Sequence, residues 1–60
     1  MTTHTVYWVG LVKHGQIQFL VAGPFADLEQ AGNERDLRSS AKPNAVYRLA
    51  EQTIEVEELL

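Results

Sequence analysis

The first half of the chain carries a long run of apolar positions that few polar residues interrupt. Residues 6–25 contain a single charge, Lys13. The run is rich in β-branched and aromatic side chains, a composition that favours strands. His14-Gly15 divides it, and glycine readily takes the positive φ that a two-residue type I′ turn needs. The pattern therefore predicts a β-hairpin over residues 5–22.

The register of this hairpin divides its side chains between two faces. A two-residue turn pairs Lys13 with Gln16, and strict alternation then places every other residue. One face, which we assign to the core, holds six apolar residues: Val6, Trp8, Val12, Ile17, Phe19 and Val21. Gly10 is expected opposite Phe19, where it makes room for the ring. The other face is apolar as well, with Tyr7, Val9, Leu11, Leu20 and Ala22.

The second half of the chain predicts one helix and a return to the sheet. Gly23-Pro24 ends the second strand, and Asp27 is a good N-cap for a helix over about 27–39. The alternative is a shorter helix that ends at Gly32 and is followed by a loose turn. Residues 45–57 alternate like a strand, either one bulged strand or two strands joined by a tight turn. The expected fold is α+β, of order ββαβ or ββαββ, with one helix packed on a small antiparallel sheet in a single domain.

The size of the chain makes its apolar content hard to bury. A chain of 60 residues buries only about 60% of the surface that its unfolded form exposes. It has no cysteine, so neither a disulfide nor a thiolate metal site can add stability. The sequence shows no secretory signal and no membrane span, and we expect a cytoplasmic protein that gains stability from self-association or from a partner.

The charges point away from nucleic acid. A net charge of −3 argues against direct binding to a phosphate backbone. Beyond Arg48 the chain has no basic residue, and the acidic residues there are Glu51, Glu55, Glu57 and Glu58. We expect this acidic edge to steer a basic partner, such as a protein whose surface normally holds nucleic acid.

The sequence contains no convincing arrangement for catalysis or for metal binding. His4 and His14 lie ten residues apart on an extended strand, about 33 Å at ~3.3 Å per residue. Ser39-Ser40 has no evident base to activate a hydroxyl. We therefore expect no enzyme activity, no cofactor and no metal.

The second apolar face of the hairpin is the strongest functional signal. Monomers seldom expose large contiguous apolar patches. We expect its anchors to be Tyr7, Val9, Leu11 and Leu20, acting together with the acidic edge. Two copies that meet through this face would form a C2 homodimer. The sequence thus predicts a small non-enzymatic protein-binding module or inhibitor.

Two resemblances add to this interpretation. The segment with Gly23-Pro24-Phe25 and Ala31 resembles half of a SPOR domain, in which such a turn leads from a strand into a helix with a small inward residue. That resemblance implies, as the alternative function, a module that binds cell-wall glycan. The short, acidic, cysteine-free chain is also similar to phage-encoded inhibitors, anti-CRISPR proteins among them, which implies an inhibitor role.

Overall fold

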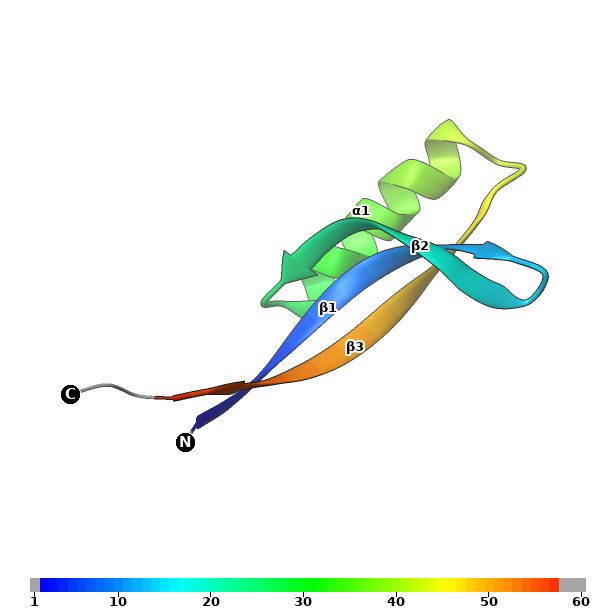
Figure 1. The fold of residues 1–60 in the computed structure, drawn as a ribbon. Helices are drawn as coiled ribbons and strands as arrows, with labels where there is room; N and C mark the ends of the chain where they lie inside the picture. The colour runs from blue at the N-terminus through cyan, green and yellow to red at the C-terminus, as the bar shows by residue number, and fades with distance from the viewer. Residues whose placement is uncertain (1, 58–60) are drawn as a thin grey trace.

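The computed structural model describes residues 2–57 and shows the α+β fold that the sequence predicts (Figure 1). Its elements, in chain order, are β1 (Thr2–Lys13), β2 (Gln16–Phe25), α1 (Leu28–Ala41) and β3 (Val46–Val56). The strands form one antiparallel sheet in the order β2-β1-β3, so β1 is the central strand. The helix α1 contacts all three strands.

The hairpin has the predicted turn, but it extends from Thr2 to Phe25 instead of over residues 5–22, and β2 continues through Gly23-Pro24, which we expected to end it. Its register also differs from the prediction. His14 and Gly15 have φ angles of 56° and 78°, as a type I′ turn requires, and Lys13 pairs with Gln16. Three register shifts follow along β2, and each inserts an extra residue as a β-bulge does. Gly10 consequently pairs with Leu20 rather than with Phe19. Simple alternation of side chains counted from the turn therefore does not predict which face most residues of β2 occupy.

By contrast, the ladder between β1 and β3 has no register shift. It runs from the pair Thr2–Val56 to the pair Val12–Val46, so the C-terminal region forms one strand and not two. Residues directly opposite each other share a face of the sheet. The ladder thus places the odd-numbered residues of both strands on one face and the even-numbered residues on the other.

The helix covers the face that we expected to remain free. Val9 and Ala31 are the hydrophobic residues in the described part of the chain that are fully buried, with 0% exposure. Val9 lies on the central strand and Ala31 on α1, so α1 packs over the odd-numbered face. Ala22 pairs with Val9, and the small side chains of these alanines let the helix approach closely. The predicted core assignment was wrong, and Phe19 is 60% exposed.

The helix itself follows its predicted signals, with a later end. The Asp27 carboxylate accepts a hydrogen bond of 2.9 Å from the backbone N–H of Glu29, which caps the first turn. The helix passes through Gly32 and ends at Ala41, just before the Lys42-Pro43 break. Within residues 2–57 no helix has both the length and the apolar character needed to cross a membrane.

The two internal glycines Gly10 and Gly32 should respond oppositely to the same substitution. A Cβ at Gly10 would lie 2.5 Å from Ile17 Cγ2, whereas nothing lies within 4 Å of a Cβ at Gly32. We expect Gly10→Ala to lower the free energy of unfolding by about 1–3 kcal/mol through overpacking. Gly32→Ala should raise it by up to about 1 kcal/mol through helix propensity. Urea denaturation followed by circular dichroism measures both, and equal effects would contradict the packing of Ile17 over Gly10.

Candidate interface: the open face of the sheet

The even-numbered side of the sheet lies opposite the helix, and we call it the open face. Strand pairing places nine apolar residues on it: Val6, Trp8, Val12, Ile17, Leu20, Val46, Ala50, Ile54 and Val56. Leu20, Val46 and Val56 are exposed, and the other six are partly exposed. The open face is therefore a largely apolar surface that extends over all three strands and is interrupted on β1 and β3 by Thr2, His4, Arg48 and Gln52.

Two side chains lie flat along this face and make it smooth. The indole N–H of Trp8 donates a hydrogen bond of 3.0 Å to Gln52 Oε1 on β3. On the other side, a Cβ at Gly23 would lie only 2.9 Å from Trp8 Cε3, so the ring covers the backbone of β2. Ile17 covers Gly10 in the same way. Glycine in these two positions thus lets large side chains lie on the sheet instead of projecting from it.

At one end the sheet narrows to a two-stranded arm. The last residue pair between β1 and β2 is Tyr7–Phe25, so residues 2–6 of β1 pair only with residues 52–56 of β3. Figure 1 shows this arm projecting beyond α1 and β2. Two-stranded ribbons are marginal by themselves in water.

The two sides of the arm differ in polarity. Its open-face side carries Val6, Ile54 and Val56 together with Thr2, His4 and Gln52, and its other side carries threonines and Glu55. Apolar side chains of the open face therefore reach the end of the arm, but polar side chains alternate with them there.

Most of the predicted anchors lie on the covered side of the sheet. Tyr7, Val9 and Leu11 occupy the odd-numbered face, beneath or beside α1, and Val9 has no exposed surface left for a partner. Leu20 pairs with Gly10 and is exposed on the open face. The signal that sequence reasoning missed is the small size of Ala22 and Ala31, which marks the face that a helix can approach.

The predicted acidic edge is separated from the open face. Glu51 pairs with Tyr7 and Glu55 pairs with Thr3, so both carboxylates belong to the odd-numbered side. Glu51, Glu55 and Glu57 are exposed, and Glu58 lies outside the described residues. The structure therefore does not join the acidic residues and the apolar surface into one site.

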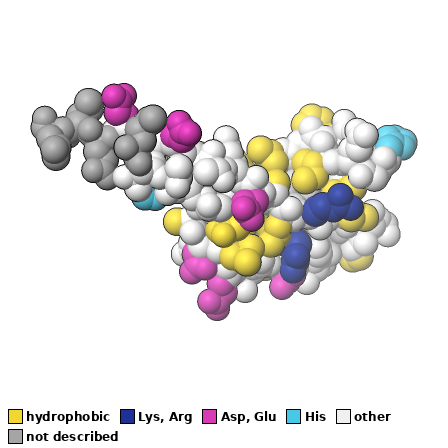
Figure 2. Space-filling model, turned by 90° about the horizontal axis from the view of Figure 1, so that it is seen from below, with side chains coloured by type: hydrophobic (Ala, Val, Ile, Leu, Met, Phe, Trp, Pro, Cys, Tyr) yellow, Lys and Arg dark blue, Asp and Glu magenta, His cyan; other side chains and the backbone are white. Residues whose placement is uncertain are grey.

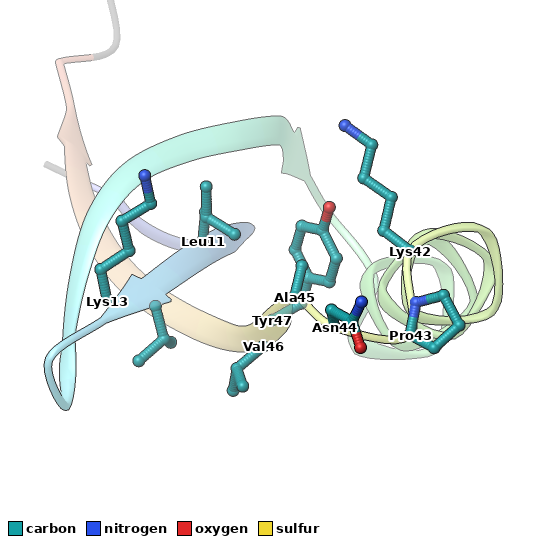
Figure 3. Close-up of a pocket in the computed structure, with 9 residues that line it drawn as sticks. Leu11, Lys13, Lys42, Pro43, Asn44, Ala45, Val46 and Tyr47 are labelled. Atoms are coloured by element: carbon teal, nitrogen blue, oxygen red, sulfur yellow. The ribbon is translucent and has the colours of Figure 1, made fainter.

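A groove of about 520 Å³ lies at the opposite end of the molecule from the arm, between the end of β1 and the loop that joins α1 to β3. Leu11, Tyr47 and Pro43 contribute apolar lining, with Lys13 on one side and Lys42 on the other (Figure 3). Figure 3 shows Val46 pointing away from these side chains, as its place on the open face requires.

Within the described part of the chain, the lysines of the groove have no acidic partner. The ion pairs found within residues 2–57 are Arg38–Glu34 at 3.0 Å and Arg35–Asp36 at 3.3 Å, both inside α1. The cations outside these pairs, Lys13, Lys42 and Arg48, all lie toward the hairpin end of the sheet.

Unpaired charges are thus segregated along the long axis of the molecule. The carboxylates outside the ion pairs lie toward the arm and the start of α1: Asp27, Glu29, Glu51, Glu55 and Glu57. In Figure 2 the visible acidic side chains lie on the side of the basic ones that faces the chain termini. Along β1 the rows of Thr3 and Lys13 are about 33 Å apart, well beyond a Debye length of ~10 Å. Only the outermost charges are this far apart, because Arg48 and Glu51 lie three residues apart on β3, about 10 Å.

The chemistry of the described residues offers no stronger alternative site. Residues 2–57 contain no group of three or more His, Asp or Glu side chains placed to hold a metal ion. Comparisons with family models, with curated proteins and with solved structures each gave no match. The SPOR resemblance therefore stays a prediction that rests on Gly23-Pro24-Phe25 and Ala31.

The same conservative substitution, valine to threonine, should have different effects on the two faces of the sheet. Val9→Thr places a hydroxyl at a fully buried position and should lower the free energy of unfolding by about 1–3 kcal/mol. Val46→Thr makes the same change where the side chain is 58% exposed, and in the isolated chain the effect should stay within ~0.5 kcal/mol. Parallel urea titrations of the two variants measure this difference. A larger loss for Val46→Thr would mean that the helix packs on the other face.

Proposed function

We propose that this chain is a small protein-binding module that acts by association and not by catalysis, with the open face as its docking surface. The observation that supports this most directly is an imbalance in burial. The helix covers one face of the sheet and buries Val9, while the other face keeps a largely apolar surface exposed. Contiguous apolar surface of this kind is typical of interaction sites.

The energetics of so small a chain support the same proposal. The core of a domain of this size rarely contributes more than ~3–5 kcal/mol to stability. Complete burial of an aliphatic side chain contributes about 1.5–3 kcal/mol, and Leu20 and Val46, which are 52% and 58% exposed, would each gain roughly half of that from a partner. A partner that covers the open face would therefore add stability comparable to that of the isolated fold, through linkage of binding to folding.

The flatness of the open face favours a protein as the partner. Trp8 and Ile17 lie along the sheet, so the middle of the surface offers broad contact, and the groove of about 520 Å³ opens beside its hairpin end, where Val12 and Val46 contribute to the lining. Aromatic and aliphatic anchors held on a rigid sheet are characteristic of binding hot spots. An inhibitor role, as in the phage proteins that the chain resembles, would use the same surface to block a partner in the cytoplasm.

Capture by matched variants tests the docking surface. Val46→Glu introduces a charge on the open face, and Leu37→Glu introduces the same charge at a helix position of similar exposure, 67% against 58%. Immobilised wild-type chain and the Leu37 variant should retain the same proteins from a cell extract. The Val46 variant should lose them at least tenfold, because a charge in an apolar interface is desolvated without a partner.

Folding must be compared in the same samples, by circular dichroism and by urea titration. Retention by the Val46 variant equal to that of the wild type, with both folded, would refute the open face as the docking surface.

A further inference from the structure

We propose that the groove at the hairpin end of the molecule binds a small amphipathic carboxylate, an apolar chain or ring that carries one negative charge. This site goes beyond the proposed function and does not depend on the open face as a docking surface. Three features of the described residues support it: an apolar floor, two unpaired lysines at the sides of the groove, and a backbone that fixes where those lysines lie.

The floor of the groove is apolar. Leu11 on β1 pairs with Tyr47 on β3, so the two side chains lie next to each other on the helix side of the sheet. Pro43 adds apolar surface from the loop between α1 and β3. The volume of about 520 Å³ lies within the range of small-molecule pockets, ~300–1,000 Å³. The groove can therefore shelter a ring or a chain of several methylene groups from water.

The polar side chains of the groove include hydrogen-bond donors that lack partners. Both lysines of the chain, Lys13 and Lys42, are lining residues, and none of the described lining residues carries a carboxylate. Within residues 2–57 neither lysine forms an ion pair, and the Tyr47 hydroxyl forms no hydrogen bond. Figure 3 shows the two ammonium groups and this hydroxyl pointing to the same side of the groove, with Leu11 between the lysines. An anionic group at that side would meet donors from both walls.

The backbone fixes the position of both lysines. The N–H of Lys42 donates a hydrogen bond of 3.0 Å to the carbonyl of Arg38, and its carbonyl accepts one of 3.0 Å from the N–H of Ala45. Pro43, between them, has a restricted φ. On the other wall Lys13 belongs to the central strand, in the last paired row before the turn. Binding therefore requires little ordering of the backbone, which reduces its entropic cost.

The electrostatic surroundings favour one negative charge over two. The net charge of −3 repels a dianion more strongly than a monoanion. The C-terminal end of α1, which carries a partial negative charge, also borders the groove at Lys42. On the same face of β3 the nearest carboxylate, Glu51, lies four residues beyond Tyr47, about 13 Å. A carboxylate, with one charge and two acceptor oxygens, therefore fits the donors better than a phosphate ester does.

A titration of the full ¹⁵N-labelled chain with octanoate, followed by the NMR shifts of its amides, tests the proposal. Octanoate should bind with a dissociation constant on the order of 1 mM, as expected for ten non-hydrogen atoms, and should shift the amides of Leu11, Ala45 and Tyr47. Butanoate and 1-octanol should each bind about tenfold more weakly, because butanoate lacks four of the methylene groups and 1-octanol lacks the charge.

Matched variants separate the groove from a general effect of charge. Lys13→Gln and Lys42→Gln each remove one positive charge from the groove, and Arg48→Gln removes one from the open face; all three side chains are exposed. Each lysine variant should bind octanoate about threefold more weakly than the wild type, and the double variant about tenfold. Arg48→Gln should leave the affinity unchanged. Circular dichroism of the same samples checks that the variants fold.

Several outcomes would overturn the proposal. Equal affinities for octanoate and 1-octanol, or equal losses for Arg48→Gln and the lysine variants, would mean that the groove does not recognise an anion. Shifts centred on Trp8 and Ala50 would place the ligand on the open face. Tighter binding of octyl phosphate than of octanoate would exclude a carboxylate as the preferred group. The titration uses no captured protein, so each of these outcomes leaves the test of the docking surface independent.

Discussion

The central strand has two apolar faces, and the described chain supplies one helix to cover them. β1 carries Val9 on one side and Trp8 on the other, so whichever face the helix takes, the other stays without a covering helix in the described chain. The helix takes the side of Val9, because Ala22 and Ala31 let it approach closely there. On the opposite side Trp8 and Ile17 lie flat over glycines and give partial cover. The rest of the architecture follows from this division.

The same division determines how surface properties are distributed. Because β3 pairs with β1 without a bulge, the carboxylates of Glu51 and Glu55 share the helix side of the sheet. The exposed apolar side chains of Val46 and Val56 share the other side. Charged and apolar side chains that are adjacent in the sequence of β3 therefore lie on opposite faces of the sheet. An interface on the open face can be almost uncharged while the ends of the molecule remain strongly and oppositely charged.

Part of the candidate site could be predicted because it depends on local rules. The apolar hairpin, the His14-Gly15 turn and the N-cap at Asp27 each follow from the preferences of a few adjacent residues. The conclusion that one apolar face lacks cover also follows from the composition of the hairpin. The identity of that face does not, because both faces of β1 carry large apolar side chains. Only the position of the helix distinguishes Val9, which is buried, from Val12, which is partly exposed.

The sequence by itself determined the type and order of the main elements, the α+β class and the surplus of apolar side chains, because turn chemistry, capping and alternation act between near neighbours. It left open whether residues 45–57 form one strand or two, which their pairing with β1 decided. The tertiary structure alone decided the register of β2, where three shifts override alternation. It also decided the face that the helix covers and the side on which the acidic residues lie. These outcomes depend on how side chains distant in sequence fit together, such as Trp8 on Gly23 and Ile17 on Gly10, and periodicity along one strand carries no information about that fit.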